Sequence, residues 1–242
     1  MAHFRKYYSN SSALSYFIPP RTTVVGILAG LLGRERDTYY NEFSLKKCNI
    51  ALAIQSPIKK SIQKLNLLMI KSEKDFNGSA EYPSQTATEL IIPQNLQKGY
   101  IDYQIWVTHE DDKIINNLEN LIRKEFVGYF SKGISVALGT AYNLGWLERG
   151  HILEGKDVKE TSPIEIDSVI PQNYCGEIFI EGTADGQYRL IKEEVPLEFD
   201  NDRKITSRGL GNMIINLTGQ PVKAKVDSFV RLEDGKNIMW ME

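Results

Sequence analysis

The chain has 242 residues, of which 42% are hydrophobic and 25% are charged, as in an ordinary globular protein. This composition excludes a mainly disordered chain, and the longest apolar run, residues 24–32, is too short to cross a bilayer. Residues 1–20 contain no apolar segment typical of a secretory signal, and Cys48 and Cys175 lack the spacing of a zinc site or a disulfide framework. We therefore expect a cytoplasmic protein with no metal, no cofactor and no membrane contact.

The net charge of −2 conceals an uneven distribution of charge along the chain. Residues 1–74 contain 12 Lys and Arg against 4 Asp and Glu, whereas the remaining residues contain 17 against 27. The basic first third indicates either an anionic partner for that third or charges that folding mixes with acidic residues from elsewhere. From charge alone, both interpretations stay open.

The beginning of the chain predicts an ordered loop followed by a helix. Residues 1–20 are rich in tyrosine and hydroxyl side chains, and a proline pair ends any regular element there. A helix should run over residues 22–32, with Thr22 or Thr23 capping its start. Gly33 suits the position just after its last turn.

The rest of the first 150 residues predicts a mixture of strands and one further helix. In chain order we expect a strand over 49–55, a turn with Lys59 and Lys60 near its tip, an antiparallel partner strand over 62–71, a turn-rich inserted arm over 72–100, a strand over 100–107, an amphipathic helix over 111–126, and a strand or tight turn followed by a helical turn over 135–146.

Beyond residue 150, short β-like segments separated by turns predict an antiparallel β subdomain over 151–242. Its expected strands lie over 164–170, 176–181, 188–192 and 222–229. The fold class is thus α+β. One additional strand before the first helix would give residues 1–150 the β-α-β-β-α-β order of a ferredoxin-like fold, but that strand is missing from this chain. We expect both helices of residues 1–150 to pack on one face of an antiparallel sheet.

The segment from residue 3 to residue 23 carries the strongest functional signal. Cationic groups neutralise phosphates, aromatic faces stack on unpaired bases, and hydroxyl and helix N–H groups bind phosphate oxygens. The alternative is a structural loop whose tyrosines fill the core. The candidate RNA-binding residues are Arg5, Lys6, Tyr7, Tyr8, Tyr16, Arg21, Thr22 and Thr23. On this interpretation, Arg21→Ala should weaken RNA binding across sequences by roughly 1 kcal/mol or more and flatten its salt dependence.

Signals for catalysis are weak. His3, His109 and His151 are scattered without metal-ligand spacing. His109 is either a polar residue at the start of the helix over 111–126, which we favour, or a general acid or base. Gly209 and Gly211 could let the backbone approach an anion, but a simple turn is the preferred interpretation. We predict no catalytic residue.

Residues 2–33, AHFRKYYSNSSALSYFIPPRTTVVGILAGLLG, resemble the opening of a CRISPR-associated family. This is Cas family five of the repeat-associated mysterious protein (RAMP) superfamily, and the type I-B subgroup is the most similar. The matching features are the aromatic-basic loop, the Pro-Pro-x-Thr turn and the glycine-spaced helix that ends in Leu-Gly. Later segments resemble the family in the same order, over residues 86–90, 100–107, 137–147 and 195–203.

The resemblance implies a non-catalytic, RNA-binding subunit of a Cascade ribonucleoprotein in antiviral defence. Such a subunit grips the 5′ handle of the CRISPR RNA and inserts its arm, here residues 72–100, as a thumb. Its implied partners are the backbone subunit, the large subunit and, through the assembled complex, target DNA. The family's first, central strand is missing here, and an open slot in its place would expose unpaired backbone groups unless another segment fills it.

The alternative function is a metal-independent endoribonuclease that processes precursor CRISPR RNA. In the type I-C subgroup, the resemblance implies cleavage of the repeat by a tyrosine, a lysine and a histidine. Here His109 follows Thr108 rather than a lysine, and its next neighbours are acidic and would repel a phosphate. The non-catalytic function is therefore preferred.

Overall fold

The computed structural model describes residues 1–9, 12–66, 70, 72–81, 85–122, 136–148, 150–180 and 188–242. The helices are α1 (Arg21–Leu31), α2 (Glu73–Asn77) and α3 (Asp112–Ile122), with one 3-10 turn at Gln172–Tyr174. The strands are β1 (Phe4–Arg5), β2 (Ser15–Tyr16), β3 (Cys48–Ile54), β4 (Ile58–Leu65), β5 (Thr86–Pro93), β6 (Tyr103–His109), β7 (Gly155–Val158), β8 (Ile164–Ile166), β9 (Ile170–Pro171), β10 (Cys175–Ile178), β11 (Leu190–Pro196), β12 (Leu210–Asn216), β13 (Val222–Val226), β14 (Phe229–Leu232) and β15 (Asn237–Ile238). Among the described residues, no helix has the length and apolar character needed to cross a membrane.

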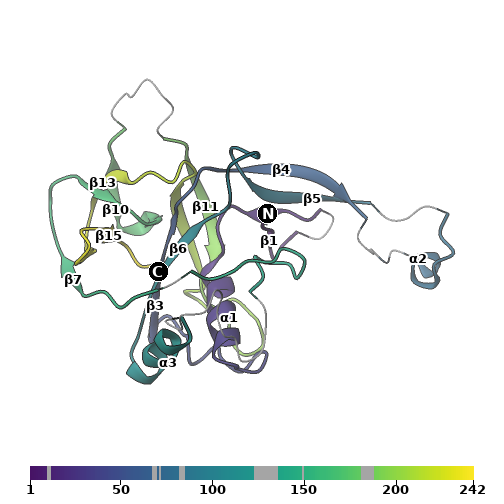
Figure 1. Cartoon of the computed structure of the whole chain (residues 1–242), viewed down its shortest axis with the longest axis horizontal. Coiled ribbons are helices and arrows are strands. Elements are labelled where there is room, and N and C mark those ends of the chain that lie inside the picture. The colour runs from purple at the N-terminus through teal and green to yellow at the C-terminus, as the bar shows by residue number, and fades with distance from the viewer. Residues whose placement is uncertain are drawn as a thin grey trace.

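The molecule consists of a body and an arm that extends from it (Figure 1). The arm is the antiparallel hairpin of β4 and β5, in register from Ile58 opposite Pro93 to Leu65 opposite Thr86, and α2 lies at its far end. In the body, α1 and α3 contact each other. The N-terminus lies at the base of the arm, where Ala2 forms a β-bridge with Ile91 of β5.

Helix α1 confirms the helix predicted over 22–32, with each end shifted by one residue. The proline pair precedes its first turn, and Gly33 ends it with a positive φ of 71°. The N–H of Gly33 donates to the Gly30 carbonyl at 3.1 Å, and the N–H of Arg34 donates to the Ala29 carbonyl at 2.9 Å. These two bonds form a Schellman motif, which satisfies carbonyls that the helix end would otherwise leave without donors.

The main hydrophobic core joins elements from both ends of the chain. It contains, among others, Val24, Leu28, Ile50, Leu52, Ile114, Leu118, Val195, Met213, Ile215 and Met241. Residues of the region over 151–242 thus pack in the same core as residues of α1, α3 and β3. It also has a cluster of its own, which includes Ile166, Ile170, Val222, Ala224, Val226, Phe229 and Met239.

The strand pairing expected for the first half is wrong in one respect. Strand β3 pairs with β6, and β4 pairs with β5, so β4 is not the partner of β3. Lys59 and Lys60 accordingly lie within β4 rather than at the tip of a turn. The start of β4 is fixed instead by a distant residue, because the Ile58 N–H donates to the Leu217 carbonyl at 3.0 Å. The arm therefore begins at Ile58, earlier than the predicted 72–100.

The other edge of β3 does not lie open. The Met241 N–H donates to the Ile50 carbonyl and the Val169 N–H donates to the Leu52 carbonyl, both at 2.8 Å. Two segments from beyond residue 150 thus satisfy backbone groups along this edge, which reduces its tendency to pair with other chains.

Strands in the described residues overlap all four segments predicted beyond residue 150. Strands β7, β12 and β15 lie outside those segments. In β12, Gly211 lies opposite Val195 of β11, so the simple turn expected for this glycine is wrong. The turn closes just before it, where the Gly209 N–H donates to the Thr206 carbonyl at 2.9 Å. Parts of other predicted elements, at 10–11, 67–69, 71, 82–84, 123–126, 135 and 181, lie outside the described residues.

Candidate nucleic-acid interface

The N-terminal loop, which the structure describes over residues 1–9 and 12–20, folds against the base of the arm. Its strands β1 and β2 pair with each other, with Phe4 opposite Tyr16. Ala2 and Ile91 exchange two backbone hydrogen bonds of 3.0 and 2.8 Å, and the Ala13 N–H donates to β5 at 3.1 Å. These bonds order a segment whose sequence is rich in polar residues and contains a proline pair.

Two aromatic rings of the N-terminal loop face solvent. Tyr7 and Tyr8 are 49% and 53% exposed, and their rings meet edge to face with centroids 5.2 Å apart. The exposed Arg5 belongs to the same loop, and its guanidinium donates at 3.0 Å to the carbonyl of Ser9, the residue that follows Tyr8. Exposed aromatic faces next to a cation are the groups that bind single-stranded nucleic acid through stacking and charge.

Lys6 lies largely inside the protein, although it directly precedes these rings. Its Nζ is 2.9 Å from Oε1 of Glu193 and 5.2 Å from the ring centroid of Tyr16. Burial disfavours its charged form, but the interactions with Glu193 and Tyr8 together outweigh burial and raise the pKa of Lys6 above its ordinary value. Lys6 therefore stays charged at neutral pH, with its charge paired within the fold.

Arg21 is buried in the core, with 1% of its surface exposed. Its guanidinium donates to four carbonyls: Leu197 at 2.9 Å, Phe43 at 2.9 Å, Ser44 at 3.2 Å and Cys48 at 2.6 Å. This arginine links the start of α1 to two distant segments of backbone. It has no accessible donor for a phosphate, so we remove Arg21 from the candidate RNA contacts.

Tyr16 is also removed from the candidates, because it is 1% exposed and packs in the main core. Burial raises the pKa of its hydroxyl, which favours the neutral form. Thr22 and Thr23 lie partly exposed in the first turn of α1, so their expected contact with phosphates stays a prediction.

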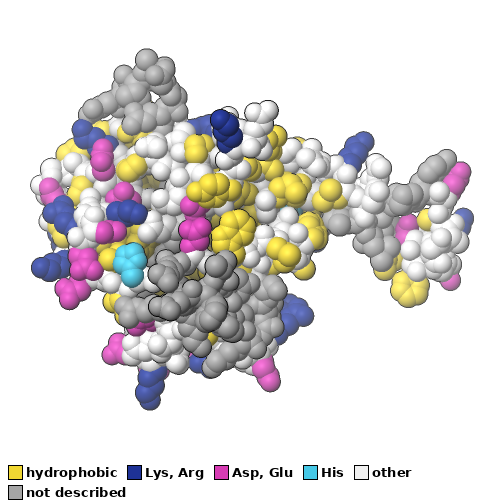
Figure 2. Space-filling model, viewed as in Figure 1, with side chains coloured by type: hydrophobic (Ala, Val, Ile, Leu, Met, Phe, Trp, Pro, Cys, Tyr) yellow, Lys and Arg dark blue, Asp and Glu magenta, His cyan; other side chains and the backbone are white. Residues whose placement is uncertain are grey.

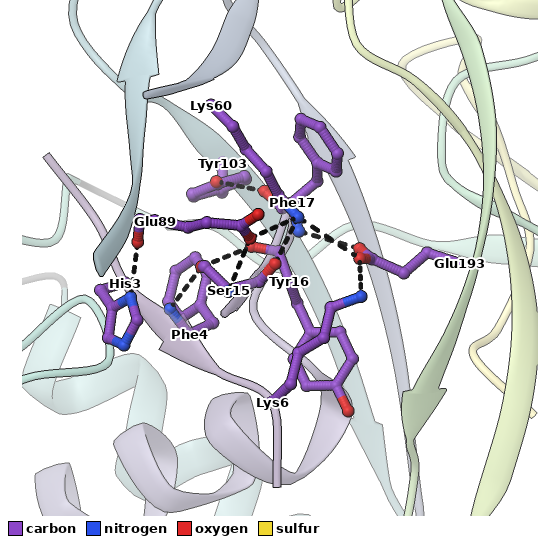
Figure 3. Close-up of polar contacts among 10 residues, drawn as sticks. All are labelled: His3, Phe4, Lys6, Ser15, Tyr16, Phe17, Lys60, Glu89, Tyr103 and Glu193. Carbon is purple, nitrogen blue, oxygen red and sulfur yellow. Dashed lines mark hydrogen bonds and ion pairs between the residues drawn. The ribbon is translucent and has the colours of Figure 1, made fainter. Parts of the chain in front are cut away.

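Four charged side chains from three parts of the chain meet beside the N-terminal loop (Figure 3). They are Lys6 from the loop, Lys60 and Glu89 from the two strands of the arm, and Glu193 from β11. The Nζ of Lys60 lies 3.2 Å from Oε2 of Glu89 and 3.8 Å from Oε1 of Glu193. Each of the four side chains is less than one-fifth exposed.

This four-residue cluster also holds the backbone of the loop. The Ser15 N–H donates to Oε2 of Glu89 at 2.9 Å, and the Phe17 N–H donates to Oε2 of Glu193 at 2.8 Å. Lys60 donates to the Ser15 carbonyl. The sequence contains no local signal for this cluster, since Phe17 and Glu193 are 176 residues apart.

The positive charge of the first third of the chain is partly mixed with acidic residues from later segments. Besides the cluster, Lys47 pairs with Glu110 at 3.4 Å. Figure 2 shows Lys and Arg scattered over the visible face, while hydrophobic side chains gather over the base of the arm. Among the predicted RNA-binding residues, Arg5 is the cation that lies exposed.

His109 is buried where β6 leads into α3. Its Nδ1 accepts the Asp111 N–H at 2.9 Å, and its Nε2 donates to the Glu42 carbonyl at 2.8 Å, which defines the tautomer. This geometry confirms the interpretation of His109 as a polar residue at the start of the helix. The described part of the chain contains no group of three or more His, Cys, Asp or Glu that could hold a metal.

We expect His109→Ala to lower the free energy of unfolding by about 1–3 kcal/mol, because it removes two partly buried hydrogen bonds of a buried side chain. His109→Asn is the matched control, since its side-chain oxygen can still accept the Asp111 N–H and retain part of that stability. RNA affinity of the folded protein should be unchanged in both variants. Urea unfolding and a filter-binding assay measure the two quantities. A metal-independent cleavage activity that His109→Ala abolishes would contradict the structural role.

No protein-family model and no curated protein matches the sequence. Among solved structures, a chain described as "CRISPR RNA-guided surveillance complex" is similar to this chain. The alignment covers 94% of this chain and 87% of that chain, with a TM-score of 0.41 and 13% sequence identity. This TM-score and this sequence identity are too low to support a conclusion about the family of this chain. The resemblance to Cas family five therefore rests on the sequence segments described above.

Proposed function

We propose that this chain is a non-catalytic RNA-binding subunit of a type I, I-B-like CRISPR Cascade complex that grips the 5′ handle of the CRISPR RNA. The observation that carries the proposal is the exposed pair of Tyr7 and Tyr8 on the N-terminal loop, which also carries the exposed Arg5. Base–aromatic stacking contributes about 1–3 kcal/mol per base. Unpaired bases at an RNA end suit such a site, because their faces are free to stack.

The arm supports a second RNA contact. In α2, at the far end of the arm, Phe76 is 76% exposed, and Ile62 is an exposed apolar side chain on β4. Exposed apolar groups on an extended hairpin can pack against bases that have left a stack. We propose that this hairpin, which begins at Ile58, is the thumb implied by the resemblance.

We also propose the core fold, the protein partners and the cellular location that the resemblance implies for such a subunit. The helices α1 and α3 with strands β3 and β6 would belong to a ferredoxin-like core. The backbone and large subunits of the complex would be its protein partners in the cytoplasm, and target DNA would be met only in the assembled complex.

The proposal is tested by co-purifying the chain with RNA from cells that express the whole complex, followed by sequencing of the 5′ ends of the bound RNA. We expect one shared 5′ sequence derived from the repeat. RNA with unrelated 5′ ends, or no RNA, would contradict the proposal. A parallel incubation of precursor repeat RNA with the purified chain in EDTA should leave the RNA intact, and specific cleavage would instead support the endoribonuclease.

A further inference from the structure

We propose that Glu193 is a positioning residue that fixes the N-terminal loop and the arm to each other as one unit. The consequence for RNA rests on the proposed function, whereas the mechanical coupling does not. Glu193 lies on β11, outside both the loop and the arm, and it is 7% exposed. It contacts both of them, as Figure 3 shows.

The two carboxylate oxygens of Glu193 have different partners. Oε2 accepts the Phe17 N–H at 2.8 Å, while Oε1 lies 2.9 Å from Nζ of Lys6 and 3.8 Å from Nζ of Lys60. Hydrogen bonds to an ionised group are stronger than neutral ones, and a site with little water strengthens them further. One side chain therefore holds the loop at two points and approaches the arm at a third.

Lys60 extends this connection into the arm. Its Nζ pairs with Glu89 on the neighbouring strand, donates to the Ser15 carbonyl, and lies 4.2 Å from the ring centroid of Phe17. Both strands of the arm are thus attached to the same short stretch of the loop. Movement of the arm at its base would have to break these contacts.

The four charges of the cluster balance, with two cations and two carboxylates in a mostly buried site. Removing the charge of Glu193 leaves Lys6 and Lys60 with Glu89 as the remaining carboxylate of the cluster. An uncompensated buried charge is costly, so the cluster is expected to rearrange, with a lysine moving toward solvent. Glu193 therefore controls where Lys6 lies.

The position of Lys6 in turn affects the exposed rings. Lys6 directly precedes Tyr7, and its Nζ lies 5.9 Å from the ring centroid of Tyr8. A loop held in its binding conformation loses less conformational entropy when a ligand binds. The cluster thus prepares Tyr7 and Tyr8 for stacking without itself contacting RNA.

The test compares Glu193→Gln with Glu194→Gln. Glu194 is the next residue on β11 and is exposed, and both substitutions remove one negative charge. If general electrostatics alone mattered, both variants would bind RNA equally well or more tightly than the wild type. We expect Glu193→Gln to bind single-stranded RNA about fivefold to tenfold more weakly, and Glu194→Gln to bind no more weakly than the wild type.

Hydrogen exchange provides a readout that does not depend on RNA. In Glu193→Gln the cluster should rearrange because it loses one of its two carboxylates. The Phe17 amide, which donates to Glu193, and the Ser15 amide, which donates to Glu89, should then exchange at least about tenfold faster, while amides of β13 should be unchanged. If Glu193→Gln does not fold, Glu193→Asp keeps the charge on a shorter side chain and should show faster exchange at Phe17. Unchanged exchange at these amides in a folded variant would overturn the inference.

The experiments distinguish failure of the proposed RNA-binding function from failure of the positioning role of Glu193. A wild-type chain that binds no RNA would contradict the proposed function, and the exchange measurement would still decide the positioning role. Equal RNA affinities of Glu193→Gln and Glu194→Gln, with unchanged exchange in the loop, would overturn the positioning role and leave the proposed function intact.

Discussion

Arg21→Met is expected to lower the free energy of unfolding by about 3–5 kcal/mol. The guanidinium donates to carbonyls of Leu197, Phe43, Ser44 and Cys48, all of which would lose their charged donor. Methionine fills a similar volume but donates no hydrogen bond. The start of α1 would therefore lose its connection to the backbone near residues 43–48 and 197.

Urea unfolding measures this effect, and Arg203→Met is the matched control. Arg203 forms an exposed ion pair with Asp37 at 2.7 Å, and such pairs contribute about 0–1 kcal/mol. The salt dependence of RNA binding by the folded fraction of Arg21→Met should equal that of the wild type. A variant that keeps its stability but shows a flatter salt dependence would place Arg21 in contact with phosphate.

The double substitution Tyr7→Ala/Tyr8→Ala is expected to weaken binding of single-stranded RNA by about tenfold to a hundredfold. The substitution removes both exposed rings of the loop, and stability should change little because about half of each side chain lies in solvent. Fluorescence anisotropy with a labelled RNA measures the affinity. Tyr7→Phe/Tyr8→Phe should bind nearly as tightly as the wild type, because the stacking faces remain.

Tyr142→Ala is the control for loss of an exposed tyrosine as such. Tyr142 is 53% exposed, like Tyr8, but it lies in the segment over 136–148, away from Tyr7 and Tyr8 in sequence. It should leave RNA affinity unchanged. Equal loss of affinity in Tyr142→Ala and in the double variant would contradict a specific role for the loop.

Sequence patterns predict the helices α1 and α3, because residues close in sequence determine where these helices lie. The glycine after α1 and the proline pair before it mark the helix within one residue, and apolar periodicity marks α3. The partner of β3 could not be predicted in the same way. A hairpin between neighbouring segments was the simplest pairing, whereas the structure pairs β3 with β6 across the whole arm.

The predicted RNA-binding residues also differ in exposure for reasons that local sequence does not show. Tyr7, Tyr8, Tyr16 and Arg21 lie within one short segment, and nothing local separates the exposed pair from the buried pair. Contacts with distant residues decide which side chains are buried. Arg21 donates to the Leu197 carbonyl, 176 residues away, and Lys6 forms an ion pair with Glu193. Burial of a charged residue is decided by such partners rather than by its neighbours in sequence.

Photo-cross-linking tests the central claim most directly. The chain would be irradiated with a single-stranded RNA that carries a photoreactive base at its 5′ end, digested with trypsin and examined by mass spectrometry. Cleavage after Lys6 and Arg21 separates residues 7–21 from the rest of the chain. We predict RNA attached to this peptide at Tyr7 or Tyr8, with the attachment lost in Tyr7→Ala/Tyr8→Ala. Cross-links confined to peptides outside residues 1–21, and unchanged in that variant, would contradict RNA binding by the N-terminal loop.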